Sequence, residues 1–155
     1  MIIAKSIMRV ILIPVLAIFL VSCGKEAPPV SLELLDGNTL QQADWQGKWV
    51  YINYWAEWCK PCAEEIPELN QFAAARSHVL VLGVNFDKPS VADLLRQANG
   101  FRIAFPVVTS DIQLAFPHPV PQGLPSTIVI NPEGKIVDTL QGPQTQATLA
   151  QAMKL

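Results

Sequence analysis

Residues 53–67 read NYWAEWCKPCAEEIP, and this segment carries the strongest structural signal in the chain. It follows a run of β-forming residues at 49–54, which predicts a buried strand. It contains two cysteines at CxxC spacing, Cys59 and Cys62. Apolar residues then recur at helical spacing and predict a helix from about residue 59 to residue 76: Ile66, Leu69, Phe72 and Ala73. The segment therefore joins a strand, a pair of cysteines and a helix in direct succession.

A CxxC pair commonly serves as half of a zinc site, as a haem attachment site or as a redox dithiol. A structural zinc site needs four ligands, and the chain offers beyond this pair only His78, His118 and Cys23, without zinc-finger spacing. Haem attachment needs a histidine directly after the second cysteine, where this chain has Ala63. The redox dithiol is the interpretation that remains.

The two cysteines have different expected roles. Cys59 is placed at the start of the helix, where unpaired N–H groups and the positive end of the dipole stabilise a thiolate, so it is the candidate nucleophile. Cys62, one turn later, is the candidate resolving thiol. Pro61 suits the first turn, where a missing N–H costs nothing. Lys60 either tunes the pair with its positive charge or is a solvated loop residue.

NYWAEWCKPC resembles the active-site segment of thioredoxin, and Pro67 matches the proline inside that family's active-site helix. Within the thioredoxin superfamily the chain is most similar to the membrane-anchored TlpA/ResA-like branch, through NYW at 53–55 and CAEEIP at 62–67. GLPST at 123–127 resembles the loop whose cis-proline, here Pro125, faces the dithiol. The resemblance covers nearly all of residues 23–155. It implies an α/β, thioredoxin-like three-layer fold, with a central mixed sheet flanked by helices and an N-terminal β-hairpin.

The remaining patterns suit a mixed sheet between helices, in the order β-α-β-α-β-β-α. A hairpin is expected around the turn at residues 36–37, and a helix capped by Ser90 is expected to end near Gly100. Four prolines exclude regular structure at residues 116–125. The other expected elements are strands at 79–85, 127–131 and 135–139, a strand or extended segment at 105–109, and a closing helix at 145–154.

The resemblance also implies a role for Glu65. Thioredoxin has a buried aspartate where this chain has Asn53, which cannot titrate, and the ResA-like members place a glutamate three residues after the second cysteine. Glu65 has that spacing and is the candidate acid and base for Cys62. The alternative is that Glu64, Glu65 and Glu68 form the solvated face of the helix.

The loop before the strand at 127–131 is the candidate substrate-binding segment. Leu124 would present its backbone edge to a bound peptide if the next bond, to Pro125, is cis; an ordinary turn proline is the alternative. Trp55 and Trp58 are expected to contribute partly to the core and partly to the apolar surroundings of the sulfur. His118 is expected to be an exposed loop residue, with an approach to the dithiol as the alternative. The candidate substrate-binding residues are Trp58, Lys60, Pro61, Leu124 and Pro125, beside the candidate catalytic residues Cys59, Cys62 and Glu65.

The N-terminus reads as a lipoprotein signal peptide covering residues 1–22. Lys5 and Arg9 precede an apolar run of about a dozen residues, shorter than the roughly 20 that span a bilayer. LVSC at 20–23 resembles the lipobox of bacterial lipoproteins and makes Cys23 the lipidated residue, with a free cysteine as the alternative. Residues 23–30 would then be a lipidated tether and 31–155 a single thioredoxin-like domain, facing the periplasm or extracytoplasmic space from a bacterial membrane.

Composition narrows the partners. Without the signal segment, nine basic residues stand against thirteen acidic ones, a net charge of about −4 with no basic cluster, so nucleic acid is not expected as a partner. With one cysteine for lipid and two in the CxxC pair, no structural disulfide framework is possible. We expect a monomer that uses no metal and no cofactor beyond the Cys59–Cys62 disulfide.

The function that these features predict is a thiol–disulfide oxidoreductase of the cell envelope. The resemblance favours reduction of exported protein disulfides, for example during cytochrome c maturation, with electrons from a membrane dithiol donor; the sequence itself leaves the direction open. The alternative is a copper metallochaperone similar to the Sco proteins, which use CxxxC spacing and a downstream histidine. A thiol peroxidase is set aside because the chain lacks the PxxxTxxC arrangement.

Overall fold

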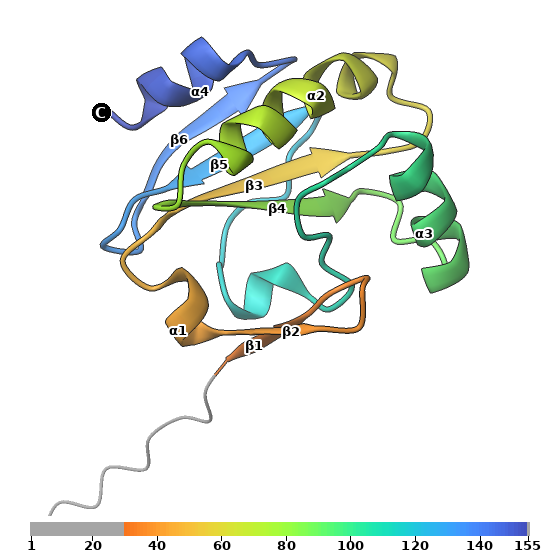
Figure 1. Cartoon of the computed structure of the whole chain (residues 1–155), viewed down its shortest axis with the longest axis horizontal. Coiled ribbons are helices and arrows are strands. Elements are labelled where there is room, and N and C mark those ends of the chain that lie inside the picture. The colour runs from red at the N-terminus through yellow and green to blue at the C-terminus, as the bar shows by residue number, and fades with distance from the viewer. Residues whose placement is uncertain (1–29, 155) are drawn as a thin grey trace, which may run out of the picture.

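A four-stranded mixed sheet of order β4-β3-β5-β6 forms the centre of the protein (Figure 1). The computed structural model describes residues 30–154. Strand β3 (Trp49–Trp55) is parallel to β4 (Val79–Asn85) and antiparallel to β5 (Ser126–Ile130), which is antiparallel to β6 (Ile136–Gln141). Because β3 is central and covered on both faces, its apolar residues are almost all buried.

Helices α2 (Lys60–Ala74) and α4 (Gln146–Ala152) cover one face of this sheet (Figure 1). The buried side chains of α2 recur every three or four residues, as predicted, and pack with Leu149 of α4 against alternate residues of the strands. The apolar members of this layer include Tyr51, Ile66, Leu69, Phe72, Val81 and Val129.

The opposite face is covered by the N-terminal hairpin of β1 (Ser31–Glu33) and β2 (Thr39–Gln41) and by two short helices. These are α1 (Gln42–Trp45) and the 3-10 helix Ile112–Leu114. The hairpin was predicted, whereas neither short helix was. Their buried residues pack against the other set of alternate strand residues, which includes Val50, Ile52 and Tyr54.

Helix α3 (Val91–Gly100) lies beside the carboxyl end of β4 (Figure 1). Ser90 caps it by accepting a hydrogen bond from the backbone N–H of Asp93, as the sequence predicted. Leu94 and Ala98 pack in the same buried cluster as Trp55 and the two cysteines. Helix α3 therefore meets the end of β3 and the start of α2, which precede it by more than 25 residues in the sequence.

Of the strand or extended segment expected at residues 105–109, the described part of the chain shows no regular strand. Two isolated bridges replace it, Gly83 with Val107 and Leu34 with Val108. The segment lies close against β4, where a Cβ on Gly83 would meet a ring carbon of Phe105 at 3.0 Å. Glycine at this position allows this close approach.

The predicted signal peptide, Cys23 and most of the predicted tether lie outside the described residues. Among residues 30–154, no helix has the length and apolar character needed to cross a membrane.

Candidate active site

The two cysteines of the CxxC motif form a disulfide at the start of α2. Their Cα atoms are 5.3 Å apart, and Cys59 is the N-cap of the helix while Cys62 lies in its first turn. The backbone N–H of Cys62 donates to Sγ of Cys59 at 3.3 Å. Cys59 is 3% exposed and Cys62 is fully buried, so Cys59 is the more accessible of the two cysteines. The position of Cys59 at the amino end of the helix dipole favours its thiolate once the disulfide is reduced.

Lys60 and Pro61 occupy the exposed outer side of this first turn. Trp58, directly before Cys59, is 64% exposed, and its indole N–H donates to Oδ2 of Asp87 at 2.8 Å. Trp55, in contrast, is fully buried in the core. The structure thus divides the two tryptophans: Trp55 belongs to the core, and Trp58 presents a flat apolar side chain at the surface beside the reactive sulfur.

A buried polar cluster lies between β3, α2 and β5. The side-chain amide of Asn53 donates to Oε2 of Glu65 and to Oγ1 of Thr127, each at 3.0 Å. Glu65 is 1% exposed, and this burial raises its pKa to about 7, although the hydrogen bond from Asn53 acts in the opposite direction. Oε1 of Glu65 and Oδ1 of Asn53 find no partner among the described residues. The carboxyl group can therefore hold or release a proton near neutral pH.

The interpretation of Glu65 as part of a solvated face is therefore wrong, whereas it holds for Glu64, which is exposed. Glu68 is half-buried, and its Oε2 accepts from the backbone N–H of Gln146, the first residue of α4. It thus ties α2 to α4 and favours the amino end of that helix. Thr127 was not predicted as part of the cluster; it lies opposite Asn53 in the β3–β5 register, which the sequence pattern did not define.

The peptide bond between Leu124 and Pro125 is cis, as predicted from the motif at 123–127. Pro125 is buried, and half-buried Leu124 packs against the cluster that contains Cys59 and Cys62. Within residues 30–154, no backbone hydrogen bond involves the N–H or C=O of Leu124. The fold thus brings this loop against the buried cluster that contains the dithiol.

His118 is 8% exposed, so its expected exposure was wrong. Its Nε2 lies 2.8 Å from the hydroxyl of Tyr54, and its Nδ1 contacts the backbone carbonyl of Phe116. Both ring nitrogens are engaged in this way. In the described part of the chain, no three His, Cys, Asp or Glu side chains gather into a group that could hold a metal ion.

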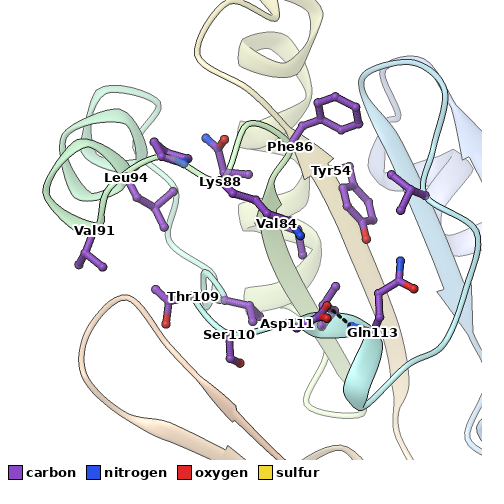
Figure 2. Close-up of a pocket in the computed structure, with 15 residues that line it drawn as sticks. Tyr54, Val84, Phe86, Lys88, Val91, Leu94, Thr109, Ser110, Asp111 and Gln113 are labelled. Carbon is purple, nitrogen blue, oxygen red and sulfur yellow. Dashed lines mark hydrogen bonds between the residues drawn. The ribbon is translucent and has the colours of Figure 1, made fainter.

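A cavity of about 340 Å³ lies next to Tyr54, on the face of the sheet away from α2. Figure 2 shows it between the β4–α3 segment and residues 109–113, with the hydroxyl of Tyr54 directed toward Gln113. Phe86 and Lys88 line its edge. Asp87 lies between these two residues and binds Trp58, so the edge of the cavity is connected to the segment before Cys59.

Comparisons with known proteins agree with this geometry. The model of the AhpC/TSA family matches residues 23–139, more than half of the chain. The chain belongs to this family. Thiol-disulfide oxidoreductase ResA of Bacillus subtilis (strain 168) is 34% identical over 138 residues, covering 87% of this chain and 76% of the relative.

Solved structures of other proteins share the fold. StoA from Bacillus subtilis superposes with a TM-score of 0.64 at 20% identity, over 79% of this chain and 94% of that protein. The exposed lipoprotein thioredoxin Etrx1 of Streptococcus pneumoniae strain TIGR4 has a TM-score of 0.68 at 27% identity, over 81% and 98%. The AhpC/TSA match, the activity of the curated relatives and the Cys59–Cys62 disulfide together make this chain a thiol–disulfide oxidoreductase.

Proposed function

We propose that the protein is an extracytoplasmic reductase of disulfides in exported proteins, held at a membrane by lipid on Cys23. The observation that carries the proposal is the Cys59–Cys62 disulfide at the amino end of α2, with Leu124 packed against the same cluster. A reactive sulfur and a free stretch of backbone side by side suit a substrate that is itself a peptide chain.

The reaction begins from the reduced protein. The thiolate of Cys59 attacks one sulfur of the substrate disulfide, forms a mixed disulfide and releases the other substrate sulfur as a thiolate, which takes up a proton from water. Cys62, as a thiolate, then attacks Sγ of Cys59. The bond between Cys59 and the substrate breaks, the second substrate sulfur leaves as a thiolate that is protonated in the same way, and the Cys59–Cys62 disulfide re-forms. Two electrons pass to the substrate, and a membrane dithiol donor returns two electrons to the protein.

Glu65 is proposed as the acid and base for Cys62. Resolution requires Cys62 to lose its proton, and Cys62 is buried where water does not reach it. Glu65 follows Cys62 by three residues on α2, nearly one turn. Its pKa of about 7 suits a group that accepts and returns a proton at neutral pH. The side-chain amide of Asn53 donates to the carboxyl group of Glu65, and Thr127 accepts from the same amide and so helps to hold Asn53 in place.

The location outside the cytoplasm rests on the first 30 residues. Residues 1–22 have the order of a signal peptide ending in a lipobox, and the family match begins only at Cys23. The name of one structural relative, exposed lipoprotein thioredoxin, describes a protein attached in this way. We assign residues 1–22 to the signal, 23–30 to the tether and 31–155 to the catalytic domain.

Trapping the mixed disulfide tests the proposal. In a Cys62→Ala variant expressed as the full chain, Cys59 is expected to remain bound to its substrates, because the resolving thiol is missing. Membranes are separated and the trapped proteins identified by mass spectrometry. Exported proteins with disulfides are expected in the membrane fraction, and the matched Cys59→Ala variant, which retains Cys62, should trap far fewer.

The direction of electron transfer is tested by bringing the protein to equilibrium with glutathione. A reductase should pass its electrons to glutathione disulfide nearly completely at equilibrium. A strongly oxidising dithiol, or trapped proteins that are exclusively cytoplasmic, would overturn the proposed function.

A further inference from the structure

The proline-rich loop at residues 117–124 leads directly into the cis peptide bond, yet few contacts hold it. Prolines at 117, 119 and 121 have no N–H to donate. Among the described residues, no backbone–backbone hydrogen bond involves any residue of this loop. Something other than backbone pairing must therefore fix the path of the chain before Leu124.

Packing also supports the loop only in part. A cavity of about 340 Å³ lies on one side of it and a hollow of about 250 Å³ on the other, and Val120 lines both. Before Leu124, only His118 and Pro121 of this loop are buried. The loop lies between two cavities, so its conformation depends largely on the few side chains that pack against the core.

The hydrogen bond between His118 and Tyr54 is one of these contacts. The backbone carbonyl of Phe116 can only accept, so Nδ1 of His118 donates to it, and in the neutral ring Nε2 is then an acceptor. The Tyr54 hydroxyl, 2.8 Å away, donates to Nε2. Burial raises the pKa of Tyr54 to about 12, so the phenol keeps the proton that this bond needs. The rings pack edge to face, 5.7 Å apart.

Tyr54 fixes the other end of the loop as well. Its backbone is in register with Ser126, the residue directly after Pro125. The segment from His118 to Ser126 is therefore held at both ends by Tyr54. His118 contacts its side chain, and Ser126 pairs with its backbone. Leu124 and the cis peptide bond lie inside this closed segment.

We propose that Tyr54 and His118 are positioning residues whose hydrogen bond holds the proline-rich loop so that the backbone edge of Leu124 is ready to receive the peptide on either side of a substrate disulfide. This inference rests on the proposed function. A loop fixed before binding costs less to order when the peptide arrives, so the pair acts on peptide disulfides. It does not act on the dithiol itself, because Tyr54 belongs to the core cluster on the face away from α2 and the cysteines belong to another.

The test compares two tyrosines of β3. Tyr54→Phe removes the hydroxyl that binds His118. Tyr51→Phe is the matched control, because it also removes a buried tyrosine hydroxyl from β3, one that donates to the carbonyl of Leu149 at 2.8 Å on the opposite face. For each reduced protein, the rate constant of thiol exchange is measured with a ten-residue peptide carrying a glutathione mixed disulfide and with hydroxyethyl disulfide, which has no peptide backbone.

We expect Tyr54→Phe to slow exchange with the peptide about fivefold, the factor that corresponds to one ordinary hydrogen bond. Exchange with hydroxyethyl disulfide and the equilibrium with glutathione should remain within twofold of the original protein. Tyr51→Phe should leave the ratio of the two rate constants unchanged, even if it lowers stability.

A second pair of variants tests His118 directly. His118→Gln can place a carbonyl oxygen where Nε2 accepts from Tyr54 and should keep most of the preference for the peptide. Leucine in His118→Leu cannot accept a hydrogen bond, so this variant should lose the preference for the peptide to the same extent as Tyr54→Phe.

Equal ratios in Tyr54→Phe and Tyr51→Phe, or full preference in His118→Leu, would overturn the positioning role while leaving the reductase intact. An original protein that exchanges no faster with the peptide than with hydroxyethyl disulfide would overturn the inference as well. Failure of the proposed function gives a different result, an oxidising dithiol at equilibrium with glutathione.

Discussion

Asn53 and Tyr54 are neighbours on β3, and each is the centre of a buried polar group on opposite faces of the sheet. On the α2 face, Asn53 joins Glu65 and Thr127, and two of the oxygen atoms of this cluster have no partner within residues 30–154. On the other face, Tyr54 joins His118, whose two ring nitrogens both have partners. One strand thus supports an incompletely paired site and a completely paired one.

The difference corresponds to two kinds of role. A buried carboxyl group with an unpaired oxygen is unstable as an anion, so its proton is held or released at a pH near its raised pKa. A ring with every donor and acceptor in use is fixed in orientation instead. The α2 face is therefore suited to proton transfer beside the dithiol, and the opposite face to holding a loop in place.

The largest expected effect concerns Glu65. Its pKa is about 7 in the folded protein against an ordinary value of 4.5, so the folded state keeps a proton that the unfolded state has lost between these two pH values. The stability due to the protonated form is complete below about pH 4.5 and is lost as the pH rises through 7. The shift corresponds to about 3 kcal/mol of unfolding free energy.

Urea unfolding of the oxidised protein at several pH values from 4 to 8.5 measures this effect. Glu65→Gln cannot titrate, so the difference in unfolding free energy between the original protein and the variant should fall by about 3 kcal/mol across that range. A difference that is flat with pH would show that Glu65 ionises as in water and would break the contrast between the two faces.

The next effect concerns the completely paired site. Tyr54→Phe leaves Nε2 of His118 buried without a donor, which should lower the free energy of unfolding by about 1–2 kcal/mol. Tyr51→Phe should cost a similar amount, since it leaves the carbonyl of Leu149 without the phenol. Thermal unfolding of both variants checks this, and a negligible loss in Tyr54→Phe alone would mean that the His118 contact is weak.

The smallest expected effects concern Glu68 and Glu64, the two other glutamates of α2, and they show how far Glu65 differs from them. Glu68→Gln weakens the hydrogen bond to the first N–H of α4 and should cost about 0.5–1 kcal/mol in urea unfolding at pH 7. Glu64→Gln, at an exposed position, should change stability by less than about 0.5 kcal/mol. A larger loss in Glu64→Gln than in Glu68→Gln would contradict the contacts described here.

The sequence predicted best what depends on neighbours along the chain. The CxxC pair, α2 and the Ser90 cap all follow from spacings within about four residues, and the motif around Pro125 indicated the cis bond. The burial of Glu65 followed from its spacing to Cys62 only through the family resemblance.

What the sequence did not predict depends on distant partners. Thr127 joins Asn53 only through the β3–β5 register, 74 residues along the chain. His118 is buried against Tyr54, which lies 64 residues earlier in the chain. The segment at 105–109 has a strand-like composition, but the hairpin and Gly83 each pair with only one of its residues. None of these partners leaves a periodic signal in the local sequence.

The proline-rich segment is attached to Tyr54 at both ends, through His118 and through Ser126, so residues 119–123 form the tip of a closed loop. Lengthening a closed loop costs little, about 0.6 kcal/mol for each doubling. An insertion at the tip would keep both attachment points and the strand register after Pro125. This tip is consequently the place where related chains, or an engineer, could vary the surface offered to incoming polypeptides while leaving the sulfur chemistry untouched.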